Sequence, residues 1–114
     1  MKAIRNKEVE ALKNLFMKFE NVEISHQDPL WKDIESLTCS LVVKGWSRKE
    51  IFEAVRRIED EWSGPIPDLC FNALDGFISG LLGDCAPSCI IHLPGEPKDE
   101  AELTQYVRGR EWLR

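Results

Sequence analysis

The chain has 114 residues and a formal net charge of −5, with 43% hydrophobic and 31% charged residues. This length suits one domain with one core, and this composition is near the average of globular proteins, which argues against disorder. No apolar run approaches the roughly 20 residues of a membrane-spanning helix, and the charged N-terminus does not resemble a secretory signal. We therefore expect a single cytoplasmic domain over residues 1–114.

The first helix is predicted over residues 6–19, where apolar side chains recur every three or four positions and share one face. This period breaks at residues 22–25. There, Val22 and Ile24 alternate with polar residues, which is typical of a short strand.

The second helix is expected to begin at Asp28 and Pro29. The carboxylate can accept hydrogen bonds from the free amides of a first turn, and proline fits the first helical position. Gly45 can adopt the left-handed conformation that ends many helices.

The third helix has the strongest local signature, because Ser47 and Glu50 form the pattern of a capping box. Trp46 and Ile51 flank this box as a hydrophobic staple. The apolar stripe continues to Trp62, before a Gly-Pro pair stops the helix.

Residues 68–82 are predicted to form a helix that is apolar on most sides and therefore lies at the centre of the fold. Gly76 and Gly80 lie on the same side of it, where another element could approach closely. A last helix is expected over residues 98–107. The fold class is thus mainly α, with about five helices around the central one.

A small two-stranded β element is the one expected departure from helix. Residues 89–93 form a strand-like run, Cys-Ile-Ile-His-Leu, within a longer loop. We expect this run to pair with residues 22–25.

Acidic residues are concentrated in residues 58–107, which hold ten acids and one base, Lys98, for a net charge of −9. The acids are Glu59, Asp60, Glu61, Asp68, Asp75, Asp84, Glu96, Asp99, Glu100 and Glu102. Such a field repels nucleic acid and anionic lipid and attracts basic surfaces. The alternative is a soluble domain whose charge is merely uneven.

Cys85, Cys89 and His92 are the candidates for chemistry, because three soft ligands within eight residues could hold zinc. Cys70 or His26 could supply a fourth ligand. The Cys-x3-Cys spacing departs from both the zinc and the redox motifs, so two cysteines packed in a loop, free or joined by a disulfide, are the alternative. Cys39 and Cys70 are expected to pack in the core.

Neither histidine belongs to a nucleophile motif, so we expect no enzyme and no cofactor. In its acidity, small size and lack of an active site, the chain resembles bacterial toxin-immunity proteins. That resemblance implies a basic partner, such as a nuclease toxin, bound without nucleic acid or membrane. The contact surface would include Trp62 and the acids other than Asp75. A helical adaptor, chaperone or regulatory subunit, and a small zinc or thiol protein, are the alternatives.

Overall fold

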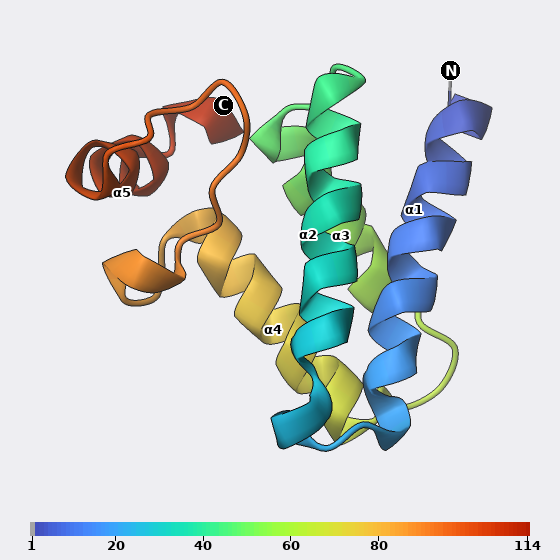
Figure 1. Ribbon diagram of the computed structural model, residues 1–114. Helices are drawn as coiled ribbons and strands as arrows, with labels where there is room; N and C mark the ends of the chain where they lie inside the picture. The colour runs from blue at the N-terminus through green and yellow to red at the C-terminus, as the bar shows by residue number, and fades with distance from the viewer. Residues whose placement is uncertain (1) are drawn as a thin grey trace.

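The computed structural model describes residues 2–114, with the side chains of residues 7–114. Within these residues the fold is mainly α, as predicted, and contains five α-helices and no strand (Figure 1). The α-helices are α1 (Lys2–Met17), α2 (Asp28–Val43), α3 (Arg48–Asp60), α4 (Asp68–Leu82) and α5 (Glu100–Gly109). Short 3₁₀ helices are η1 (Lys18–Asn21), η2 (Ile24–His26), η3 (Pro87–Cys89) and η4 (Glu111–Leu113).

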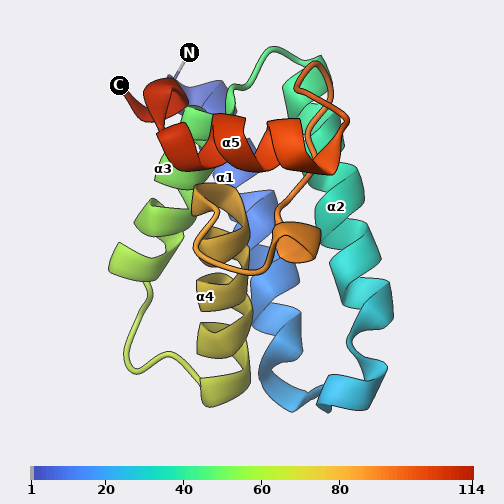
Figure 2. The same ribbon diagram turned by 90° about the vertical axis from the view of Figure 1, so that its left-hand side faces the viewer.

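The first four helices form a bundle, and α5 lies across one end of it. Helices α1 and α2 run antiparallel, side by side, while α3 and α4 pack against α1 from behind (Figure 1). After the view is turned, α5 crosses above the C-terminal end of α4 (Figure 2). The chain between α4 and α5 therefore passes along the outside of the bundle.

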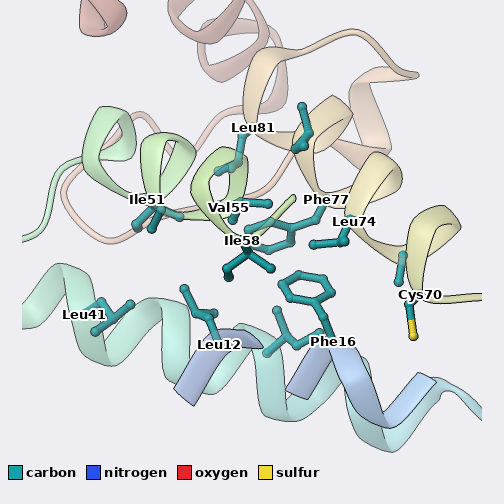
Figure 3. Close-up of a cluster of buried hydrophobic side chains, with 14 of the residues drawn as sticks. Leu12, Phe16, Leu41, Ile51, Val55, Ile58, Cys70, Leu74, Phe77 and Leu81 are labelled. Atoms are coloured by element: carbon teal, nitrogen blue, oxygen red, sulfur yellow. The ribbon is translucent and has the colours of Figure 1, made fainter. Parts of the chain in front are cut away.

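The main core is built from the apolar stripes predicted for the first four helices (Figure 3). Phe16 of α1 packs edge-on against Phe77 of α4, with ring centroids 5.5 Å apart. Helix α3 contributes Ile51, Val55 and Ile58, all nearly inaccessible to solvent. Burying such side chains contributes about 1.5–3 kcal/mol each, so this contact zone dominates the stability of the bundle.

Local signals set several of the helix ends. The predicted capping box is present: Ser47 Oγ accepts from the Glu50 amide (3.2 Å), and Glu50 Oε1 accepts from the Ser47 amide (3.0 Å). Gly45 has a φ of +106°, as its expected cap position requires. Asp28 differs from the expectation, since it lies inside the first turn of α2 and no side-chain bond caps that helix.

The predicted β element is wrong. Part of the 22–25 run is the 3₁₀ helix η2, and the two segments lie apart in both views (Figures 1 and 2). The 89–93 run is extended after η3 but lies on α4, where the Ile91 amide donates to the Gly80 carbonyl oxygen (3.1 Å). The Ile91 amide thus bonds to a helix rather than to a second strand.

The close approach predicted for the side of α4 that carries Gly76 and Gly80 is found at Gly80 and not at Gly76. A Cβ atom at Gly80 would lie 2.9 Å from Ile91 Cγ1 and 3.1 Å from the Cys89 carbonyl oxygen. A Cβ atom at Gly76 would meet nothing within 4 Å. One helix thus carries a crowded and an open glycine, four residues apart.

We predict opposite effects of alanine at these two glycines. Gly80→Ala should lower the free energy of unfolding by about 1–3 kcal/mol, the usual cost of overpacking. Gly76→Ala should raise it by up to about 1 kcal/mol, because alanine is the better helix former and space is open there. Urea denaturation followed by circular dichroism measures both. Equal stability of the two variants would contradict the close packing of residues 89–93 on α4.

Candidate functional site

A groove of about 600 Å³ lies between α2, α4 and the segment that follows α4. Its lining residues are Trp31, Ile34, Glu35, Thr38, Cys39, Gly76, Phe77, Ser79, Cys85, Ser88, Cys89, Ile90, Ile91 and His92. The exposed members Glu35, Ser88 and His92 place its mouth at the surface. Its volume is within the range of roughly 300–1,000 Å³ that is common for ligand sites.

The α2 wall follows from helical spacing. Trp31, Ile34, Glu35, Thr38 and Cys39 recur at three- and four-residue intervals and therefore lie along one face. The Thr38 hydroxyl donates to the Ile34 carbonyl oxygen (2.7 Å), so this buried polar group is satisfied within the helix. Cys39, expected in the core, is only partly buried and borders the groove.

The α4 wall owes its shape to Gly76. Because this residue has no side chain and its surroundings are open, the helix surface is hollowed at this point. Phe77 is buried beside it and supplies an aromatic floor that is continuous with the main core.

The third wall, residues 85–92, is held by hydrogen bonds from distant parts of the chain. Besides the bond between Ile91 and Gly80, Arg108 of α5 donates to the carbonyl oxygens of Gly83 (3.1 Å) and Cys85 (3.0 Å). The wall therefore depends on α5 as well as on α4.

Arg48 is the main support of this wall, and its side chain is only 1% exposed. Nη1 donates to the Leu81 carbonyl oxygen (2.9 Å), and Nη2 donates to the Ile91 carbonyl oxygen. Nε and Nη2 bind the Glu96 carboxylate at 3.1 and 2.8 Å. The guanidinium carbon also lies 5.7 Å from the centre of the Trp112 ring. One side chain thus joins α3, α4, the third wall and the C-terminal residues.

Sequence reasoning missed Arg48, which lies between the two residues of the capping box. The available signal was electrostatic. A cation at the first position of a helix faces the positive end of the helix dipole, so its presence there calls for another stabilising partner. Glu96 in the tight Pro-Gly-Glu-Pro turn is that partner.

The structure gives several of the predicted partner-binding acids a partner within the chain. Four of them pair with arginines: Glu59 with Arg56 (3.7 Å), Glu61 with Arg57 (2.9 Å), Asp84 with Arg110 (2.6 Å) and Glu96 with Arg48 (2.8 Å). Asp99 accepts from the Glu102 amide (3.1 Å) and caps α5. All four arginines lie outside the −9 segment of residues 58–107, so counting charge along the chain overstated the free negative charge of that segment.

The remaining acids are distributed over more than one surface. Asp60 ends α3 and Asp68 begins α4, whereas Glu100 and Glu102 lie in the first turn of α5, which crosses the opposite end of the bundle (Figure 2). Trp62, expected either as an interface anchor or as a core contact, is partly buried and packs against the main core. The acidic segment of the sequence is therefore not one acidic face.

Cys85, Cys89 and His92 all line the third wall of the groove. In the part of the chain that the structure describes, however, no three His, Cys, Asp or Glu side chains are placed to hold a metal ion. Cys70, a proposed fourth ligand, is buried near the start of α4, where its thiol faces the Met17 carbonyl oxygen (3.7 Å). His26 lies in η2, away from the groove lining.

Comparison with known proteins identifies no relative of this chain. No protein-family model, curated protein or solved structure matches the chain. Across residues 2–114, none of the helices combines the length and apolar character needed to cross a membrane. The functional argument therefore rests on the groove and its surroundings.

We predict that Arg48→Met lowers the free energy of unfolding by about 3–5 kcal/mol, because it leaves Glu96 and two carbonyl oxygens without their buried partner. The matched control is Arg56→Met, since Arg56 is 54% exposed in its pair with Glu59. That change should cost less than about 1 kcal/mol. Chemical denaturation of both variants is the measurement. Similar losses would show that Arg48 does not tie the wall to the bundle.

Proposed function

We propose that this chain is a protein-binding module that covers a basic partner and takes apolar side chains of that partner into the groove. The groove itself carries the proposal. Glu35 is the one carboxylate among its described lining residues, none of which is lysine or arginine. The large apolar side chains of its walls are Trp31, Ile34, Phe77, Ile90 and Ile91. Apolar walls with a few polar groups are typical of binding sites.

The occupant that fits is an amphipathic helix with basic residues beside its apolar face. A helix of this kind lays apolar side chains at three- and four-residue spacing into a groove between helices. A lysine or arginine on its flank would meet Glu35 at the mouth. Exposed acids outside the groove, among them Asp60, Asp68 and Asp75, would add to the field that draws a basic partner in.

The narrower form of the proposal is an immunity-type inhibitor in the bacterial cytoplasm that neutralises a nuclease toxin. A surface that holds nucleic acid must be basic, so such a toxin has the chemistry that this groove and the net charge of −5 would select. A helical adaptor or chaperone would use the same groove for a different basic client. The identity of the captured partner separates the two forms.

We predict that Gly76→Leu closes the groove to a partner. The new side chain would occupy open space, and leucine is a better helix former than glycine, so the fold should be retained. A fluorescently labelled amphipathic peptide of leucine and lysine is the probe, and anisotropy measures its Kd. We expect binding at least about tenfold weaker, which corresponds to about 1.4 kcal/mol.

Ser36→Leu is the matched control for this prediction, because Ser36 is exposed on α2 and does not line the groove. It adds the same apolar side chain and should leave Kd unchanged. If the peptide bound wild type and Gly76→Leu equally well, the groove would not be the binding site.

We also predict that the Glu35 carboxylate attracts the basic peptide electrostatically. Glu35→Gln should weaken peptide binding and reduce its dependence on salt, whereas Glu53→Gln, on an exposed position of α3 outside the groove, should change both far less, because it removes one charge of the general field and no contact at the mouth. Salt is informative because the screening length falls from about 10 Å at 0.1 M to about 3 Å at 1 M. A leucine–glutamate peptide that bound as tightly as the leucine–lysine peptide would rule out selection for a basic partner.

A further inference from the structure

Three of the four cysteines border the groove. Cys39 belongs to the α2 wall, and Cys85 and Cys89 belong to the third wall. All four thiols are free in the structure, and Cys70, the one outside the groove, is fully buried in the main core. The thiols that small molecules can reach are therefore gathered at one site.

Cys85 and Cys89 lie on either side of a single tight turn. The Cys89 amide donates to the Ala86 carbonyl oxygen (2.8 Å), and the Ile90 amide donates to that of Pro87 (3.3 Å), which curls the chain between the two cysteines. A turn closed by such a hydrogen bond brings the Cα atoms of its first and last residues, here Ala86 and Cys89, within about 7 Å, and Cys85 directly precedes Ala86. A disulfide between Cys85 and Cys89 requires the turn to tighten until their Cβ atoms are about 3.5–4.5 Å apart.

The thiols of Cys85 and Cys89 differ in their exposure to solvent. Cys89 is exposed at the end of η3. Cys85 is partly buried, its thiol faces the Ser79 carbonyl oxygen (3.6 Å), and its side chain packs on the small cluster of Ile90, Leu103 and Val107. Burial raises the pKa of the Cys85 thiol above its usual value of 9.0; Cys89 and Asp84 raise it further, and Arg108 lowers it.

We propose that Cys89 and Cys85 form a thiol–disulfide exchange site, with Cys89 as the entry thiol and Cys85 as the resolving thiol. The co-reactant is a small disulfide such as oxidised glutathione. The Cys89 thiolate attacks one sulfur of that disulfide, its S–S bond breaks, and one glutathione thiolate leaves and takes a proton from water. The product is a mixed disulfide at Cys89.

In the second step, the Cys85 thiol loses its proton to solvent and attacks Cys89 Sγ. The mixed disulfide breaks, and the second glutathione thiolate leaves and is protonated. Two cysteine thiols are thereby oxidised to one disulfide, and one glutathione disulfide is reduced to two glutathione molecules. Because the reactive species is the thiolate, the raised pKa of Cys85 makes this second step slow near neutral pH and faster as pH rises.

Both steps would alter the groove. A glutathionyl group on Cys89 would occupy part of the groove that this side chain lines. The Cys85–Cys89 disulfide would move the Cys85 sulfur away from Ser79 and from the small cluster. The site itself does not depend on the partner proposed above, because it requires only the chain and glutathione.

The test is to incubate the reduced, folded protein with oxidised glutathione at several pH values, block free thiols with an alkylating agent, and map the products by peptide mass spectrometry. We expect the Cys89 mixed disulfide first and the Cys85–Cys89 disulfide second, with the second step accelerating above pH 8. Cys85→Ser should stop at the mixed disulfide. Cys89→Ser should lower the rate of glutathione incorporation at least tenfold, and Cys39→Ser, the matched control in the same groove, should leave both steps unchanged.

Circular dichroism confirms that each variant is folded before its rate is compared. A Cys39–Cys89 disulfide as the main product would overturn the pairing. Glutathione trapped first on Cys39 or Cys85 would overturn the assignment of the entry thiol. A wild-type mixed disulfide that never resolves, even at high pH, would remove Cys85 from the site.

Discussion

The buried guanidinium of Arg48 is the interaction on which the arrangement of the C-terminal third depends. Taking a cation out of water is costly, and here Glu96 and the carbonyl oxygens of Leu81 and Ile91 offset that cost. Leu81 is in the last turn of α4, whose carbonyls lack helical partners, and Ile91 is in an extended run without a neighbouring strand. One side chain therefore satisfies backbone groups that would otherwise require a helix cap and a strand.

The long-range hydrogen bonds of Arg48 separate the parts of the fold that the sequence predicts from the parts that it does not. The helices follow from signals within a few residues of each other, such as the Ser47–Glu50 box and Gly45. At these helix ends the local signals and the tertiary packing favour the same structure. The extended run at residues 89–93 was recognised, but its backbone partners were not. They are Gly80 and the side chain of Arg48, and no local pattern shows that a distant arginine can replace a strand.

The site was harder to predict because it needs α2 and α4 to be placed together. The close approach predicted for Gly76 and Gly80 occurs only at Gly80, whereas Gly76 lines the groove. Cys39 was assigned to the core rather than to a groove wall. The prediction of an acidic surface was limited for a related reason. Its charges were summed along the chain, whereas an arginine such as Arg48 neutralises an acid that is distant in sequence.

The small cluster of Ile90, Leu103 and Val107 has a consequence for how the groove opens. It is separate from the main core and far smaller, and together with the bonds from Arg108 it holds α5 against the part of the third wall around Cys85 and Ile90. Segments with so few buried contacts can open while the rest of a protein remains folded. A ligand that needs the wall closed would then bind in proportion to the closed fraction, and would itself protect residues 85–110 from amide hydrogen exchange.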